Sequence, residues 1–472
     1  MTRLKSIAAL LTATALSACA VGPNYQVPPP MAAGQGTFIS AEPAVATPDA
    51  PSGEWWKLFQ DPTVDALVQE ALAANKDIAV ASANLARVRA VLSETRSGLL
   101  PSTTVSASGQ RVRDQDLLTG RYGEDDQYRA GFDMSYEVDL FGRVRRSLEA
   151  NRADTAAAQA ALDVVRISVA AETARAYADI CAAGAQIAVT KRTIALQQET
   201  YDLTSRQLEA GRGTALDTSS AATQLETSKA VLPPLEAQRT AALFRLALLL
   251  GKAPSEAPAA AANCAVVPQV RQLIPVGDGA AMLARRPDVR QAERELAAAT
   301  ARIGVATASL YPSVTLGGAI STSGLETGDL GDDFRFNVGP LISWNFPNIG
   351  AAHARVKQAG AGAEGALALF EKANLTALQE TETALNAYAR ELDRRAALTR
   401  ARDQGQTAVK LARLRYEAGS DSFLTVLVVE RNLAQLEAQL AQSDAQVTTN
   451  QIALFKALGG GACSRRSTRE VS

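Results

Sequence analysis

Two stretches of the chain alternate between apolar and polar residues with a period of two. In residues 128–140 the apolar positions are uninterrupted, and in residues 334–346 the alternation has one exception, Leu341. Successive side chains of a β-strand point to opposite faces, so this pattern predicts two strands with one apolar and one polar face. Weaker partner strands, rich in Ser, Thr and Gly, are expected at residues 103–113 and 313–323.

Alternation over about ten residues with flanking aromatic residues is typical of the strands of an outer-membrane β-barrel. A strand of a soluble β-sandwich alternates as well and remains an alternative for these segments. The polar face of the first strand carries three acidic residues that are expected to face the lumen of a channel: Asp133, Glu137 and Asp139. They either line a wetted lumen or give it a field that favours cations, and we favour the lining role.

A long helix is expected after each pair of strands. Residues 143–210 are rich in Ala, Gln and charged residues, and a second helical stretch, residues 217–250, follows Gly211-Arg212-Gly213. At about 1.5 Å per residue, the first helix would be roughly 100 Å long. A globular core does not require such a helix, whereas a tunnel does.

The chain contains an internal repeat. Glu209-Ala210-Gly211 recurs 208 positions later as Glu417-Ala418-Gly419, and Asp77-Ile78 recurs 211 positions later as Asp288-Val289. Each copy is expected to run in the order helix, strand, strand, helix, helix. The two copies are predicted at residues 54–262 and 263–461.

The first residues form a targeting segment. A basic start and an apolar run precede Leu16-Ser17-Ala18-Cys19, which resembles the bacterial lipobox. We expect residues 1–18 to be a signal peptide, Cys19 to carry lipid, and residues 19–53 to be an extended, loosely ordered lead-in. An ordinary signal peptide with an incidental cysteine is the alternative. Residues 462–472 are expected to form a disordered tail.

Composition argues against several classes of protein. Lys and Arg total 48 and Asp and Glu total 49, a balance that lacks the positive surface of a nucleic-acid-binding protein. The single histidine, His353, argues against a histidine metal site or a Ser-His-Asp triad. No phosphate-binding glycine loop is present either. We therefore expect no enzyme activity, cofactor or metal, and a periplasmic enzyme is a disfavoured alternative.

A membrane-spanning structure would have to be a closed barrel of several protomers. No apolar run of about 20 residues follows the signal segment, so no transmembrane helix is expected. Four strands are too few, because single-chain barrels begin at about eight. Two protomers would make a filled barrel, whereas three would leave a lumen, which the polar strand faces favour. A soluble coiled-coil scaffold is the alternative, and the alternation in residues 334–346 opposes it.

Five blocks of sequence resemble the NodT/OprM group of outer membrane factors, in order and over essentially the whole mature chain. They are Cys19-Ala20-Val21-Gly22-Pro23-Asn24-Tyr25-Gln26-Val27-Pro28 and residues 55–62, 136–142, 285–290 and 457–461. The resemblance implies a mostly α-helical, TolC-like fold with membrane β-strands. Four strands per protomer would contribute to a 12-stranded trimeric β-barrel in the cell outer membrane, joined to a long α-helical barrel in the periplasm.

The resemblance also implies a function. The homotrimer would be a lipid-anchored, passive conduit for drugs or other small molecules, surrounded by outer-membrane lipid. Its partners in a tripartite efflux pump would be a periplasmic membrane-fusion adaptor protein and an inner-membrane RND transporter. The conduit of a type I protein-secretion system is the alternative, and the lipobox with Gly22-Pro23-Asn24-Tyr25 favours efflux. Departures from the group's pattern are Leu427-Val428-Val429-Glu430-Arg431 and three helix glycines, Gly360, Gly362 and Gly365.

The two hairpin tips, residues 210–217 and 418–425, are expected to form the periplasmic mouth. Gly211 and Gly419 would supply the backbone freedom that a tight hairpin needs, and Asp217 belongs to the first tip. By resemblance to the family's acidic constriction, Asp421 is the candidate gate residue, as a ring of three carboxylates. A helix cap is the alternative role for Asp421.

Cys181 and Cys264 are a candidate disulfide. Once Cys19 is lipidated three cysteines remain, and Cys463 lies in the tail. The periplasm is oxidising, so two neighbouring cysteines would be joined there. Two buried free thiols are the alternative.

Overall fold

The computed structural model describes residues 20–29, 31, 34, 36–49, 52–115, 120, 122–331, 334–344, 346 and 349–460. Cys19, the predicted signal peptide, Cys463 and the predicted tail lie outside the described residues. The chain divides into two compact units. The first comprises Met1–Pro29, Ala83–Gln159 and Gln291–Lys372, and the second comprises Pro30–Ser82, Ala160–Arg290 and Ala373–Ser472.

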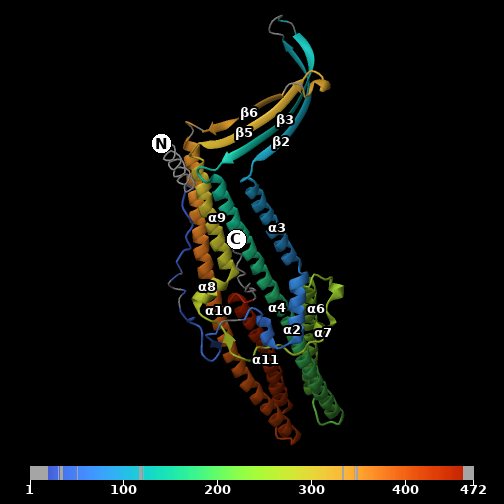
Figure 1. Ribbon diagram of the computed structural model, residues 1–472. Coiled ribbons are helices and arrows are strands. Elements are labelled where there is room, and N and C mark those ends of the chain that lie inside the picture. Colours follow the sequence, from blue (N-terminus) through green and yellow to red (C-terminus); the bar gives the residue numbers. More distant parts are fainter. Residues whose placement is uncertain are drawn as a thin grey trace. The chain divides into compact units, whose positions relative to one another are not determined.

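The first unit contains one antiparallel sheet in the order β2-β3-β5-β6 (Figure 1). Its strands are β2 (Ser102–Gln115), β3 (Tyr122–Val138), β5 (Ser313–Gly324) and β6 (Phe334–Ser343). All four predicted strands are therefore confirmed. Every strand differs from its prediction at one end or both. The largest differences are that β3 begins at Tyr122 rather than at residue 128, β3 ends at Val138 rather than at residue 140, and β6 ends at Ser343 rather than at residue 346.

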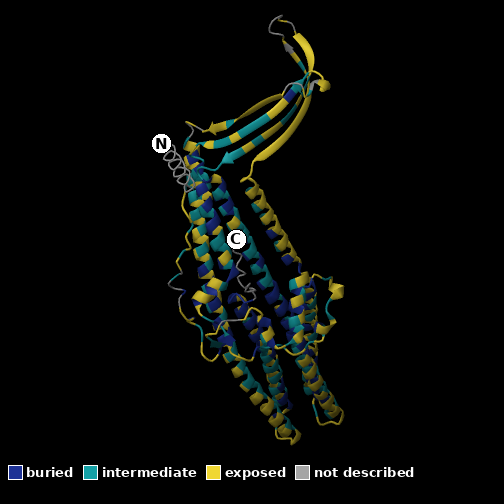
Figure 2. Cartoon of the chain, viewed as in Figure 1, coloured by how far each residue is buried: buried dark blue, intermediate teal, exposed yellow. Residues whose placement is uncertain are grey.

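The strand register aligns the apolar face across the whole sheet. Four directly paired residues form one apolar row, Val105, Phe132, Ile320 and Phe336, and all four side chains are exposed. The adjacent row on the opposite face is small or polar and consists of Thr104, Asp133, Ala319 and Asn337. Figure 2 shows the strands exposed or half-buried along most of their length, whereas buried positions concentrate on the helices. A continuous exposed apolar face marks a surface that contacts lipid or another protein.

Two very long helices confirm the helical pattern of the sequence. They are α4 (Arg143–Glu209), with 67 residues, and α10 (Ile349–Glu417), with 69. Within the first unit, α4 packs against α3 (Lys76–Ser97) and α9 (Pro287–Ala308). Asn151 donates to Thr95 on α3 at 2.8 Å, and Arg302 on α9 pairs with Asp154 at 2.6 Å.

The helix predicted at residues 217–250 is wrong as a single element. The second unit contains instead α5 (Ala215–Ala230) and α6 (Leu232–Leu249), which meet at Val231. Pro233 and Pro234 explain the break, because proline lacks the N–H that continues a helix and is favoured in the first turn of a new one. The corresponding helix of the second half, α11 (Phe423–Ala457), is unbroken.

Short elements complete the second unit. They are β1 (Ala46–Thr47), which pairs in parallel with β4 (Ile274–Pro275), η2 (Trp55–Phe59), α2 (Pro62–Ala74), η3 (Pro254–Glu256), α7 (Ala259–Ala262) and α8 (Gly279–Arg285). In the first unit, η4 (Thr327–Asp329) follows β5. The fully buried Trp55 stacks on Phe455 with ring centroids 5.1 Å apart. Among the described residues, no helix is both long enough and apolar enough to cross a membrane.

Three residues of the predicted lead-in are bound to side chains of α10. In the second unit, the backbone N–H groups of Ile39 and Ser40 both donate to the carboxylate of Glu382 at 2.8 Å. Arg390 pairs with Glu42 on the same stretch. A composition rich in Pro, Ala and Gly did not reveal these contacts, because they use backbone donors and distant side chains.

Two helix junctions in the second unit are built alike. Asn75, just before α3, donates to the carbonyl of Leu249 at the end of α6 at 2.9 Å. Arg286, just before α9, donates to the carbonyl of Ala457 at the end of α11 at 2.8 Å. Gly251 follows the end of α6 and Gly459 follows the end of α11, and both have φ near +70°. These side chains satisfy carbonyls that a helix end leaves unpaired.

Candidate functional site: the hairpin tips and the strap

The tip of the first hairpin is closed by contacts within a few residues. Gly211 has φ +71°, which only glycine adopts without strain. Thr214 caps α5 and forms a capping box with Asp217: the Asp217 N–H donates to the Thr214 hydroxyl, and the Thr214 N–H donates to the Asp217 carboxylate, both at 3.2 Å. Asp217 therefore stabilises the start of α5.

The tip of the second hairpin is closed by Asp421. Gly419 has φ +71°, like Gly211. The Asp421 carboxylate accepts hydrogen bonds from the Ser422 N–H and the Thr425 hydroxyl, each at 2.9 Å, and lies 3.4 Å from the Arg415 guanidinium. The Thr425 hydrogen bond is the main cause that lowers the pKa of the Asp421 carboxyl below its ordinary value. Asp421 thus binds the first turn of α11, although the N-cap position itself belongs to Ser422.

Helices α4 and α5 form the first hairpin, and α10 and α11 form the second. Two contacts tie the second hairpin to helix α4 of the first hairpin. The Tyr416 hydroxyl on α10 donates to the Gln207 side chain on α4. The Glu430 carboxylate on α11, 7% exposed, accepts from Arg413 on α10 at 2.7 Å. It also lies 3.4 Å from the Thr200 hydroxyl on α4, which shares its hydrogen with the Leu196 carbonyl at 3.0 Å. The buried acid thus has partners on both hairpins. Sequence reasoning noted Glu430 only as a departure from the family pattern and missed the other residues.

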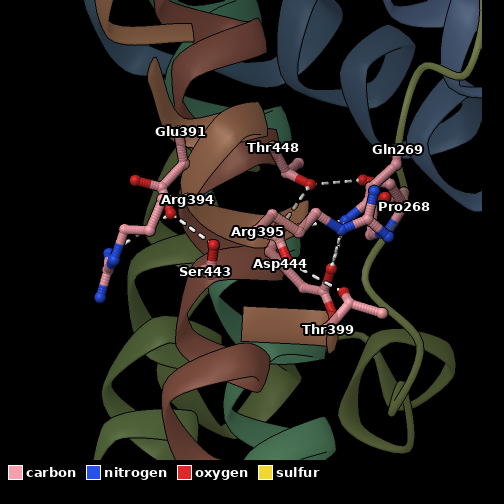
Figure 3. Close-up of polar contacts among 9 residues, drawn as sticks. All are labelled: Pro268, Gln269, Glu391, Arg394, Arg395, Thr399, Ser443, Asp444 and Thr448. Atoms are coloured by element: carbon pink, nitrogen blue, oxygen red, sulfur yellow. Dashed lines mark hydrogen bonds and ion pairs between the residues drawn. The ribbon is translucent and has the colours of Figure 1, made fainter. Parts of the chain in front are cut away.

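A strap formed by residues 264–276 crosses the second unit and is held at several points (Figure 3). The Thr448 hydroxyl on α11 donates to the Pro268 carbonyl at 2.8 Å, and Gln269 donates to the Asp444 carbonyl at 3.1 Å. Arg395 on α10 pairs with the Asp444 carboxylate at 2.6 Å. The buried Gln451 side chain accepts from the Val270 N–H at 3.1 Å and donates to its carbonyl at 2.8 Å.

The other attachment of the strap is covalent. A disulfide joins Cys181 on α4 to Cys264, the pair expected from the sequence, with the sulfur atoms 2.09 Å apart. Gly184 allows this approach, because a Cβ at that position would lie 2.0 Å from the Cys264 carbonyl oxygen. The strap therefore links α4 to α10 and α11. Sequence spacing pointed to the cysteine pair, but the packing of Gly184 against Cys264 has no local signal.

The three acidic residues predicted on the polar strand face do not share one environment. Asp133 is exposed within β3, on the face that also carries Thr104 and Asn337. Glu137 pairs with Arg143. Asp139 lies beyond the end of β3, and its carboxylate accepts from the Val144 and Arg145 N–H groups at 3.0 and 2.9 Å. The assignment of Asp139 to a strand is therefore wrong, because its carboxylate caps α4, where the helix dipole favours negative charge.

The comparisons with known proteins identify the family. The family model for outer membrane efflux proteins matches residues 67–252 and 280–460. The chain belongs to the outer membrane efflux protein family. This finding confirms the resemblance drawn from the sequence blocks, and it makes the tips, the strap and the sheet parts of an efflux channel of the outer membrane that extends into the periplasm.

Individual relatives of this outer membrane efflux protein agree. The toluene efflux pump outer membrane protein TtgC of Pseudomonas putida is 33% identical and covers 97% of this chain and 96% of its own length. Nodulation protein T of Rhizobium leguminosarum bv. viciae is 29% identical, with coverages of 99% and 96%. The solved structure of the outer-membrane channel OprN is 33% identical, covers 94% of this chain and all of its own, and gives a TM-score of 0.89. The TolC-like fold class predicted from the sequence is thereby confirmed.

Proposed function

We propose that this outer membrane efflux protein is the passive outer-membrane conduit of a tripartite RND-type pump for drugs or other small molecules. Its similarity to a toluene efflux pump component over nearly the whole length of both chains supports this assignment. The same similarity favours small-molecule efflux over the conduit of a type I protein-secretion system. A periplasmic membrane-fusion adaptor and an inner-membrane RND transporter are the proposed partners.

The proposed channel is a homotrimer with a 12-stranded barrel. The observation that carries it is the exposed apolar row Val105, Phe132, Ile320 and Phe336 across all four strands. Among the described strands, the two outer ones of this sheet, β2 and β6, each have one neighbour. A lipid-facing sheet needs partners for its edge groups, and pairing β2 of one protomer with β6 of the next supplies them.

Two neighbouring residues of β6 test which face meets lipid. Phe336 lies on the apolar row and Asn337 on the polar row. Phe336→Lys is expected to weaken membrane insertion by about 2–4 kcal/mol, whereas Asn337→Lys should be tolerated on a lumen face. The measurement is the fraction of heat-resistant trimer recovered from outer membranes. Equal losses in the two variants would contradict the assignment of the faces.

Asp421 is proposed as part of the periplasmic gate, as a ring of three carboxylates in the trimer. The contacts of Asp421 with Thr425 and Arg415 support a second, purely structural role, in which Asp421 only stabilises the start of α11. Single-channel conductance of the wild type and of Asp421→Ala, with and without divalent cations, separates the two. A gate ring predicts a changed leak or a changed block by the cations. Identical traces together with a lower melting temperature would leave Asp421 with the structural role alone.

Cys19 is proposed as the lipidation site that anchors the protein to the outer membrane. Its support is the lipobox Leu16-Ser17-Ala18-Cys19, which lies outside the described residues. Mass spectrometry of the mature amino-terminus should find a diacylated or triacylated cysteine at position 19. A mature chain that begins elsewhere, or an unmodified Cys19, would remove this part of the proposal.

A further inference from the structure

The first described residues pack closely against the turn between β3 and α4 and against helix α9. The Val21 N–H donates to the Phe141 carbonyl at 3.2 Å. Gly142, with φ +79°, is so close that a Cβ there would lie 2.7 Å from the Cα of Ala20. Gly22, with φ +90°, faces Gly304 of α9, and a Cβ on Gly22 would lie 2.5 Å from the Gly304 Cα. Any larger residue at Gly22 would therefore collide with the helix backbone.

One arginine of α4 binds three groups of this segment. Arg146 donates to the Val21 carbonyl at 3.2 Å, the Gly22 carbonyl at 3.3 Å and the Asn24 side-chain oxygen at 2.7 Å. Its side chain is only 5% exposed and also pairs with Glu149 at 2.8 Å. The fixed fork of a guanidinium can serve several acceptors at once, which a lysine ammonium on a flexible stem does less well.

The far end of the segment is held by α9. The Tyr25 hydroxyl donates to Glu293 at 2.5 Å. Burial, followed by this hydrogen bond, raises the pKa of the Tyr25 hydroxyl above its ordinary value, so the donor stays protonated at physiological pH. Residues 20–25 therefore contact both α4 and α9. In sequence they are Ala20-Val21-Gly22-Pro23-Asn24-Tyr25.

We propose that residues 20–25 are a docking segment that binds to Arg146 of the same chain. This docking fixes the amino-terminal end of the mature chain beside the turn between β3 and α4. The adjacent rings of Phe141 and Tyr311 stack with centroids 4.5 Å apart. Aromatic residues concentrate at the surfaces of a membrane, so these rings mark the level at which the segment ends. One consequence rests on the proposed lipidation: Cys19 directly precedes Ala20 in the sequence, so the lipid would be attached one residue before this segment.

The test acts on both partners of the contact in the full-length protein, purified in detergent. Gly22→Ala changes the segment alone, and Arg146→Lys changes the receptor while keeping its charge. Gly36→Ala is the control for the first, because Gly36 also has positive φ, +110°, but a Cβ there meets open space. Arg302→Lys is the control for the second, because Arg302 pairs with Asp154 on the same two helices.

The readout is the rate at which chymotrypsin cleaves after Tyr25, followed by mass spectrometry. Release of the segment should raise this rate roughly tenfold or more in Gly22→Ala and Arg146→Lys, because cleavage follows the population of the open form. Both controls should cleave at the wild-type rate. Equal rates in wild type and Gly22→Ala, or rapid cleavage of the wild type, would overturn the docking.

The same spectra report the mass of the fragment that ends at Tyr25 and so show whether Cys19 carries lipid. An unmodified cysteine in a protected segment would contradict the proposed lipid anchor and would still support the docking. A lipidated cysteine in a freely cleaved segment would support the anchor and overturn the docking. Failure of the docking is therefore distinguishable from failure of the lipid anchor.

Discussion

The two hairpin tips share a glycine turn but differ in what holds them. At the first tip, Thr214 and Asp217 satisfy each other within four residues of chain. At the second, Asp421 is tied to Arg415 across the turn, and two further contacts reach α4 through Tyr416 and Glu430. The first tip is thus stabilised locally, whereas the second combines its own local contacts with ties to the neighbouring hairpin.

This difference indicates which hairpin moves if the mouth opens. A contact between hairpins can be exchanged without unfolding either of them, whereas a capping box is lost only when its helix start frays. The first hairpin is joined to the strap covalently through Cys181, whereas α11 of the second hairpin holds the strap only by hydrogen bonds. We therefore expect the first hairpin to act as the fixed support and the second to move against it.

The largest expected effect comes from leaving Glu430 without its cation. Arg413→Met should destabilise the start of α11 by about 3 kcal/mol, because a buried carboxylate then loses its partner. Hydrogen exchange of the α11 amides near Glu430 would report the change. Lys229→Met is the control, since Lys229 and its partner Glu226, 2.8 Å away, are both exposed and such pairs contribute about 0–1 kcal/mol. Equal exchange in the two variants would show that Arg413 does not stabilise the second hairpin.

A smaller effect is expected from the hydrogen bond between Tyr416 and Gln207. Tyr416→Phe should weaken the tie between the hairpins by about 1 kcal/mol. A double-mutant cycle with Gln207→Ala, read from hydrogen exchange at the second tip, measures the coupling directly. Strictly additive effects would mean that the two side chains do not hold the hairpins together.

At the first tip, Thr214→Ala should cost about 1 kcal/mol of local helix stability, the usual effect of losing an N-cap. The exchange of the first α5 amides should rise, while amides of the second tip keep their wild-type rates. Faster exchange at both tips would contradict the local character of the first one.

The smallest effect is the pH dependence of the Asp421 contacts. Because the pKa of Asp421 is lowered in the folded protein, its stabilising contribution is present above its ordinary pKa near 4 and is lost as the pH falls through the lowered value. Exchange at the second tip should therefore stay constant from neutral pH to about 4, after correction for intrinsic rates, and rise only below it. Asp421→Asn should abolish this rise. A transition centred above pH 5 would point to another group.

Sequence patterns predicted elements whose cause is local. The four strands follow from alternation, and α4 and α10 follow from helix-forming composition. The break at Val231 was predictable from Pro233 and Pro234 but was missed, because the overall helical pattern continues through them. The contact of Thr200 with Glu430 could not be predicted, since these residues are 230 positions apart and meet only through the packing of two hairpins. The contacts of Arg146 with residues 21–24 could not be predicted either, because more than 120 positions separate them in the sequence.

We expect that the ties between the hairpins, rather than the capping box of the first tip, keep the channel closed. Single-channel conductance in planar bilayers tests it by comparing Thr200→Val/Tyr416→Phe with Thr214→Ala/Asp217→Ala. The first pair removes two side-chain donors to the other hairpin, and the second removes the capping box. We predict frequent high-conductance openings for the first double variant and wild-type traces for the second. Wild-type traces for the first double variant, or openings of the second alone, would contradict the account.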